Sequence, residues 1–306
     1  MAVSEEAGSG AVELLVDSAC LLGEGPLWCA DRHLLFWVDI YGQRLWRSDP
    51  TGQASALPLP GPASFLAQAP EGRLVAGMGR GFVLLDPDSG ATRVLEDPLA
   101  APEGTMMNDG KADRFGRVVA GSKHLAETVD KGRAFQLGPA GLRPLPGTYR
   151  VFNGPAFSPD GRRIYLTDSP SKTIVTATYD PDGGTLGKME LFAQLGSDAG
   201  YPDGMTVDEE GGIWNAEWDG GRITRYHATG DLDRSIAMPV PRPTSLTFGG
   251  SDRKRLFVTS ARTGLAAADL AAAPLSGGLF ALYPGETGIA ESVVSPPGLA
   301  GTEGPS

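Results

Sequence analysis

Oxygen-bearing side chains occupy equivalent positions in successive segments of this 306-residue chain. They are Glu24, Ser64, Asn108 with Asp109, Asn153, Asp203, and Thr244 with Ser245. Carboxylate and amide oxygens that converge on one point form a site for a hard divalent cation, such as calcium, magnesium, manganese or zinc. A cation of this kind polarises a carbonyl group and acidifies water, and a nearby carboxylate can accept the proton of that water. The set therefore predicts a metal site with hydrolytic chemistry.

A turn is the alternative explanation for each of these residues taken singly. Asn-Gly and Asp-Gly are common turn pairs, and one such pair is more often a turn than a ligand. Asn153 is harder to explain as a turn residue, because it precedes an apolar strand and its amide oxygen needs a fixed partner. Backbone, water or a metal ion could supply that partner. The equivalence of all the positions favours the ligand interpretation.

Six copies of one sequence unit must position these residues. Each copy contains an apolar strand, a short polar turn, a second strand and then Asp-Pro or Gly. The copies cover residues 34–52, 72–90, 116–137, 163–181, 212–226 and 255–283. A period of roughly 40–50 residues with chain enough for four strands is typical of a β-propeller, and neither a β-sandwich nor a β-solenoid needs it. We predict an all-β fold, a six-bladed β-propeller with four antiparallel strands per blade.

Shorter apolar segments precede the first strand of these units, as at residues 63–72, 204–211 and 243–249. In a radial four-stranded blade such segments are the innermost strands, so the residues just before them surround one mouth of the central channel. The oxygen-bearing residues occupy those places. We therefore expect them to face one another there.

Composition agrees with many short strands in one domain. The 43 glycines and 25 prolines suit frequent turns, and 41% hydrophobic residues can fill a large core. We expect a single propeller domain over residues 1–306, with the blades at about 13–285 and flexible termini. Cys20 and Cys29 are expected to be unpaired, as is usual in a reducing compartment.

The charge of the chain excludes some partners. A net charge of −11 argues against nucleic acid and anionic membranes, because phosphate binding needs clustered lysine and arginine. No apolar run is long enough to span a bilayer, and residues 1–7 lack the basic and apolar regions of a signal peptide. We expect a cytoplasmic protein that is monomeric or weakly homo-oligomeric.

Four motifs in the same order resemble those of the regucalcin/gluconolactonase/luciferin-regenerating enzyme family of six-bladed propellers. They lie at residues 23–28, 108–117, 153–162 and 202–208, and a similar tail follows at 248–264. The resemblance covers about residues 13–285. It implies a hydrolase that opens a sugar-lactone or related small lactone by attack of metal-activated water. The partner would then be a small-molecule lactone or ester.

The resemblance also implies roles for single residues. One divalent cation would be held by Glu24, Asn153 and Asp203. Asp203 would act as the catalytic base as well, since it is the usual nominee of the family. Asn108, with Asp109 beside it, would contact the substrate.

Two departures from the family pattern concern the substrate. Sugar-lactone members carry arginine two residues before the Asn of Asn-Asp-Gly, and this chain has Met106 there. Arginine holds sugar oxygens through several fixed donors, whereas methionine offers a flexible apolar surface. Members also often have Thr-Met followed by acidic residues, where this chain has Lys123 and the residues up to Glu127. We therefore expect Met106 at the substrate, and aldonolactones to be poor substrates.

The polar segment Lys123–Arg133 interrupts the third copy and predicts a surface loop near the pocket entrance. It could be a lid that brings His124 or Glu127 to the substrate, or an inert loop.

Two other functions remain open from the residues alone. The same cation and water would suit another ester or a phosphotriester, and many propellers are non-catalytic binding proteins. Acidic residues at the axis argue against a mere binding scaffold. The three histidines, His33, His124 and His227, form no convincing Ser–His–Asp or Cys–His set.

Overall fold

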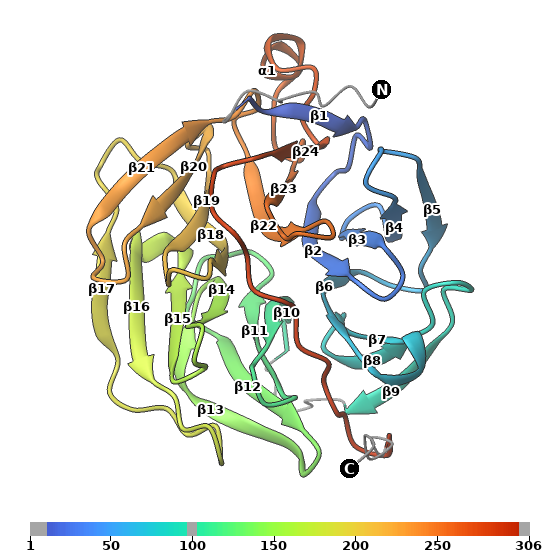
Figure 1. The fold of residues 1–306 in the computed structure, drawn as a ribbon, viewed down its shortest axis with the longest axis vertical. Helices are drawn as coiled ribbons and strands as arrows, with labels where there is room; N and C mark the ends of the chain where they lie inside the picture. The colour runs from blue at the N-terminus through green and yellow to red at the C-terminus, as the bar shows by residue number, and fades with distance from the viewer. Residues whose placement is uncertain (1–10, 97–102, 300–306) are drawn as a thin grey trace, which may run out of the picture.

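The computed structural model describes residues 11–96 and 103–299 of the chain. In these residues, six antiparallel sheets of four strands each stand in a ring around a common axis (Figure 1). The prediction of an all-β, six-bladed β-propeller is confirmed. The described helices are short: α1 (Ala267–Ala272) and two single 3₁₀ turns at Pro70–Gly72 and Ser169–Ser171. None of them is long and apolar enough to cross a membrane.

The first three blades follow the chain from the axis outward, so that consecutive strands are neighbours in each sheet. Their strands are β2 (Gly23–Cys29), β3 (Leu34–Asp39), β4 (Arg44–Ser48) and β5 (Ala54–Pro58); β6 (Ala63–Gln68), β7 (Leu74–Met78), β8 (Gly81–Leu85) and β9 (Thr92–Glu96); and β10 (Thr105–Ala112), β11 (Val118–His124), β12 (Gly132–Gly138) and β13 (Gly141–Tyr149).

The fourth and fifth blades continue in the same way, and the sixth closes the ring. Their strands are β14 (Phe152–Phe157), β15 (Arg163–Asp168), β16 (Thr173–Thr178) and β17 (Glu190–Gln194); β18 (Tyr201–Val207), β19 (Ile213–Trp218), β20 (Arg222–Tyr226) and β21 (Leu232–Ala237); and β22 (Pro243–Gly249), β23 (Arg255–Ser260), β24 (Leu279–Leu282) and β1 (Glu13–Val16). The N-terminal strand β1 pairs with β24. Strands from both ends of the chain therefore share one sheet, and hydrogen bonds close the ring.

Apolar side chains fill the interfaces between neighbouring blades. Between the first two blades, Phe36 and Val38 pack in one cluster with Leu66 and Leu74. The described residues form one such cluster at each of the six interfaces. Burying a large apolar side chain contributes about 1.5–3 kcal/mol, so these clusters hold the blades in fixed relative positions. Cys20 and Cys29 are both buried and unpaired, as predicted.

The predicted loop Lys123–Arg133 was too long at both ends. Lys123 and His124 continue β11, where they pair with Met106 and Thr105 of β10. Gly132 and the residue after it belong to β12. Cross-strand pairing therefore overrides the polar composition of these residues, and the loop spans only 125–131.

The described C-terminal segment, residues 283–299, crosses the face of the ring where the innermost strands end (Figure 1). The Val294 N–H donates to the carbonyl of Gln68 at 2.7 Å. Glu291 pairs with Lys111 near the end of β10 at 3.2 Å. The termini were predicted to be flexible. Most of the residues concerned, 1–10 and 300–306, lie outside the described residues.

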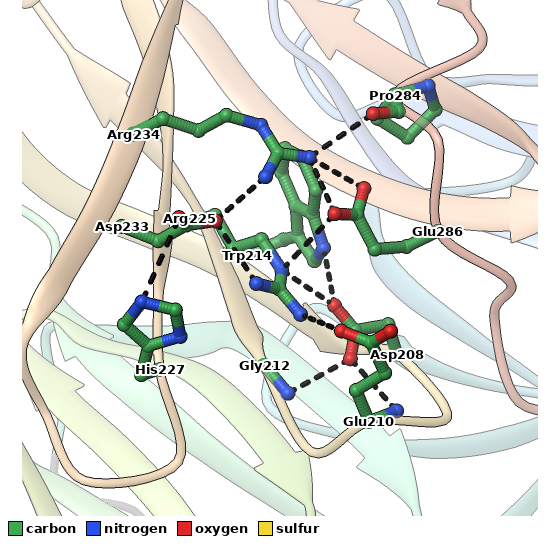
Figure 2. Close-up of polar contacts among 10 residues, drawn as sticks. All are labelled: Asp208, Glu210, Gly212, Trp214, Arg225, His227, Asp233, Arg234, Pro284 and Glu286. Carbon is green, nitrogen blue, oxygen red and sulfur yellow. Dashed lines mark hydrogen bonds and ion pairs between the residues drawn. The ribbon is translucent and has the colours of Figure 1, made fainter.

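A charged network joins this segment to the fifth blade (Figure 2). The Arg225 side chain is only 5% exposed, and its guanidinium lies 2.8 Å from the Asp208 carboxylate and 2.9 Å from that of Asp233. Arg234 pairs with Asp233 and with Glu286 of the C-terminal segment. Because several carboxylates surround the buried guanidinium, its desolvation is compensated and the segment is fixed to the blade.

Candidate active site

A cavity of about 420 Å³ lies at the mouth where the innermost strands begin. Glu24, Asn108, Asn153 and Asp203 all line it. They come from the innermost strands of four different blades, β2, β10, β14 and β18, and all four are buried. The structure thus brings together the predicted metal ligands and the predicted substrate-contacting asparagine.

Each of these inner strands has a β-bulge at the cavity-lining position or directly after it. The pairing register with the second strand of the blade shifts directly after Glu24, after Asn153 and after Pro202, which precedes Asp203. Gly25 has a φ of +54°, in the left-handed region where a β-carbon is disfavoured. The sequence prediction placed these residues just before the strands. In the structure these residues lie inside the strands, because the strands pair on both sides of each bulge.

Carboxylates at the ends of the second strands hold the segments that lead into the site. Each accepts hydrogen bonds from backbone N–H groups two or three residues before a predicted metal ligand. Asp39 accepts from Leu21 and Leu22 at 3.0 Å each, Asp168 from Arg150 and Val151 at 3.1 and 2.8 Å, and Glu217 from Gly200 at 3.3 Å. The segments before Glu24, Asn153 and Asp203 are therefore anchored by the same device in three blades.

The Asn153 amide is oriented by hydrogen bonds on both of its polar atoms. Asn108 Nδ2 donates to Asn153 Oδ1 at 2.7 Å and to the carbonyl of Phe152 at 2.9 Å. Asn153 Nδ2 donates to Ser169 Oγ at 2.8 Å. These bonds fix which side of the amide carries the oxygen. No side chain or backbone group of the described residues donates to Asn108 Oδ1, so this atom can accept from another molecule.

Asp109 is hydrogen-bonded to the neighbouring blade. Its carboxylate accepts from the N–H of Gly110 and, across the blade interface, from the N–H of Gly154, both at 2.7 Å. Gly154 follows Asn153 in the bulge. Asp109 therefore stabilises the bulge that presents Asn153.

The pKa values of the buried carboxyl groups at the site are raised. Burial, followed by the negative charges of Asp203 and Asp109, raises the pKa of Glu24 well above its ordinary value. Burial and the charge of Asp109 likewise raise the pKa of Asp203. Burial raises the pKa of Asp109 to about 6, although its two backbone N–H donors act in the opposite direction. The positive charge of Lys123 lowers the pKa of both Glu24 and Asp203 and so acts against this rise. A bound cation would relieve the mutual repulsion of the carboxylates.

The donor set fits a hard divalent cation. Within the described residues, no three His, Cys, Asp or Glu side chains are grouped closely enough to hold a metal ion by themselves. Two carboxylates, Glu24 and Asp203, and the oriented amide oxygen of Asn153 line the same cavity. Two carboxylates and one amide are oxygen ligands of the type that calcium and magnesium prefer.

Some predicted site residues do not form part of the cavity wall. Met106, predicted at the substrate, packs in the apolar cluster with Leu22 and Ile40 and does not line the cavity. Asp109 is occupied with backbone donors below the cavity wall. His124 does not line the cavity either, since its Nδ1 faces the backbone of Thr128.

The hydroxyl residues of the predicted ring also lie outside the cavity wall: Ser64, Thr244 and Ser245. Thr244 Oγ1 donates to the carbonyl of Gly23 at 2.5 Å, so it joins the sixth blade to the first. The predicted ring of six positions is therefore reduced to four in the cavity.

The loop 125–131 borders the cavity through Glu127, as predicted. Sequence reasoning missed most of the rim, which includes Tyr41, Trp218 and Arg242. A signal was available for two of them. Trp218 ends the first strand of its repeat unit, and Tyr41 lies two residues beyond the first strand of its own; in both units this is the second strand of the blade. In an antiparallel blade this end lies beside the start of the innermost strand, at the same mouth.

The fold and the cavity together define a six-bladed propeller with an acidic axial site. The sequence profile of the SMP-30/Gluconolactonase/LRE-like region matches residues 22–262. The chain therefore belongs to the SMP-30/gluconolactonase/LRE-like family.

Individual relatives agree with this assignment. The chain is 36% identical to an L-arabinolactonase of Azospirillum brasilense, over 92% of this chain and 95% of the relative. It is 34% identical to a 6-deoxy-6-sulfogluconolactonase of Pseudomonas putida, over 92% and 97%. Among solved structures, regucalcin of Agrobacterium tumefaciens, described as a calcium-binding protein, is similar with a TM-score of 0.90 at 27% identity, over 94% of this chain and 98% of that one.

Proposed function

We propose that this protein is a metal-dependent lactonase that opens a small lactone, sugar-derived or related, by attack of water on the carbonyl carbon. The observation that carries the proposal is the convergence of the buried side chains of Glu24, Asn153 and Asp203 with Asn108 in one cavity. The names of the two curated relatives, both lactonases, support the reaction class.

Glu24, Asn153 and Asp203 would hold one divalent cation. When bound, the cation supplies a Lewis acid for the lactone carbonyl and acidifies water. The description of the similar regucalcin as calcium-binding supports calcium as one choice. Magnesium, manganese and zinc are the others to be tested.

Side chains of the cavity position and deprotonate the reactants. Asp203 accepts the proton of the attacking water, the ring C–O bond breaks, and the proton passes to the leaving alkoxide to give a hydroxy acid. Asn108, whose Nδ2 is held by Asn153 and Phe152, presents Oδ1 to a substrate hydroxyl. Tyr41 and Trp218 border the cavity and limit the access of water.

Removal and replacement of the metal tests this function. The protein is stripped with a chelator, reloaded separately with calcium, magnesium, manganese or zinc, and assayed on a panel of lactones, a simple aryl ester and a phosphotriester. We expect lactone hydrolysis that is lost on stripping and restored by at least one cation, and that is absent in Asp203→Ala. Activity on the aryl ester or phosphotriester alone, or on no compound, would contradict the lactonase assignment.

A further inference from the structure

Lys123 places a buried ammonium group in the wall of the cavity. It lies near the end of β11, its side chain is only 7% exposed, and it lines the same cavity as Glu24 and Asp203. Its Nζ lies 2.8 Å from Glu127 Oε1 and 6.0 Å from the centre of the Tyr41 ring. None of the roles proposed above uses this group.

The fold does not explain the presence of a cation here. Glu127 lies on the loop 125–131 and is 48% exposed, and an ion pair with an exposed partner adds little to stability. Met106 is directly opposite Lys123 on β10, yet it is packed among apolar residues. A methionine at 123 would therefore satisfy the local packing equally well.

Lys111 gives a useful contrast within the same blade. It pairs with Glu291, a carboxylate that is only 7% exposed, at the end of the channel away from the cavity. That pair fixes the C-terminal segment and has a structural role. Lys123 has no buried carboxylate as its ion-pair partner within the described residues, and it borders open space instead.

Metal binding does not explain Lys123 either. A positive charge in the wall that holds Glu24 and Asp203 opposes the binding of a divalent cation to them. Its location suits a different task. An ammonium group carries three N–H donors; Glu127 accepts from one of them, and the Tyr41 hydroxyl can accept from a second. The group can therefore donate to an oxygen atom of a molecule in the cavity.

We propose that Lys123 is the substrate-binding residue that selects hydroxylated lactones, by donating a hydrogen bond to a ring hydroxyl. This inference rests on the lactonase function proposed above. The expectation that aldonolactones are poor substrates was based on Met106 of β10, which offers no hydrogen-bond donor. In this proposal the donor is supplied by Lys123, which lies opposite Met106 on β11. Selectivity follows because a buried donor loses a partner when the substrate lacks the hydroxyl.

The test compares Lys123→Met with the wild type in the metal-loaded full chain. Gluconolactone carries ring hydroxyls and a hydroxymethyl group, and δ-valerolactone is the same six-membered lactone without either. We expect kcat/KM for gluconolactone to fall on the order of 10- to 100-fold, and that for δ-valerolactone to change less than about threefold. We also expect calorimetry on stripped protein to show metal affinity that is unchanged or higher, because a repelling charge has been removed.

Two further variants keep the test decisive. Lys123→Arg retains the charge and donors, and should recover part of the preference for gluconolactone. Lys111→Met removes the other ion-paired lysine of the blade, and should lower the melting temperature without changing the ratio of the two kcat/KM values. If Lys123→Met does not fold, a wild-type preference for gluconolactone in Lys123→Arg supports the proposal and its complete loss overturns it.

The outcomes separate this inference from the proposed function. Equal losses on both lactones in Lys123→Met, or no loss on gluconolactone, would refute the selective role and leave the lactonase function intact. A wild-type protein that hydrolyses neither lactone with any of the four cations would refute both.

Discussion

Asn108 Nδ2 donates a 2.7 Å hydrogen bond to Asn153 Oδ1, so a residue of the third blade orients a predicted metal ligand of the fourth. The relationship links the proposed substrate-contacting position to the proposed metal site. An oriented amide oxygen needs no reorganisation on binding, and a loose one does. Substitution of Asn108 should therefore affect metal binding as well as catalysis.

We expect Asn108→Ala to weaken metal binding about tenfold, the lower end of the usual effect of removing a residue that orients a ligand. Calorimetric titration of stripped protein measures it directly. Ser169→Ala removes the partner of Asn153 Nδ2 and should give an effect in the same direction. Wild-type metal affinity in Asn108→Ala would show that this hydrogen bond does not organise the site.

The raised pKa values of Glu24, Asp203 and Asp109 predict a pH dependence that metal abolishes. A carboxyl whose pKa is higher in the folded state binds protons more tightly there, so protonation stabilises the fold. Asp109, whose pKa is raised to about 6, should therefore stabilise the stripped protein increasingly as the pH falls through that value. The raised pKa values of Glu24 and Asp203 act in the same direction. As the pH rises above about 6, the contribution of Asp109 is lost.

A bound divalent cation would neutralise the same carboxylates. The difference in melting temperature between loaded and stripped protein should therefore be larger at about pH 8 than at about pH 5, where protons compete with the metal. Scanning calorimetry across this range checks the trend. A difference that is constant with pH would mean that the cation is not held by these carboxylates.

Asp168 supports the site without lining the cavity. Asp168→Ala removes the acceptor of the Arg150 and Val151 N–H groups, which should cost about 1–3 kcal/mol of stability and misplace Asn153. Metal affinity and kcat/KM should both fall. Asp180→Ala is the matched control, since Asp180 caps an exposed outer turn of the same blade by accepting from Gly183. Equal metal affinity in the two variants would contradict the anchoring role.

Arg225 tests the network of the fifth blade (Figure 2). Arg225→Met leaves the fully buried Asp208 without its closest cation, and we expect a loss of about 3–5 kcal/mol in the free energy of unfolding. The network lies where the inner strands end, so metal affinity of the folded protein should not change. Chemical denaturation and calorimetry measure the two quantities. A stability within about 1 kcal/mol of the wild type would show that the network is dispensable.

Met106→Arg should destabilise the protein. The side chain is buried in an apolar cluster, and the new charge would stand directly opposite Lys123. We expect a loss of at least about 2 kcal/mol, part of which Lys123→Met restores in the double variant. Denaturation of the two single variants and the double variant measures the coupling. Strict additivity would show that the two side chains do not interact.

The sequence by itself determined the architecture and predicted which polar residues meet at one mouth of the ring. Repeated strand and turn signals predict a blade locally, since alternation of side chains and glycine turns depend only on neighbouring residues. Equivalent positions in such repeats must occupy equivalent places in the ring. For that reason Glu24, Asn108, Asn153 and Asp203 could be predicted together at one mouth, and the structure places all four in the cavity wall.

The tertiary structure decided the orientation of single side chains and the identity of their neighbours. Met106 and Lys123 are 17 positions apart in sequence, yet they are paired on adjacent strands, and the packing of the first two blades draws one into the core while the other borders the cavity. The hydrogen bond that the Gly154 N–H, in the bulge after Asn153, donates to Asp109 depends on contact between two blades. Such contacts arise only when the ring closes, because they join segments that no local pattern brings together.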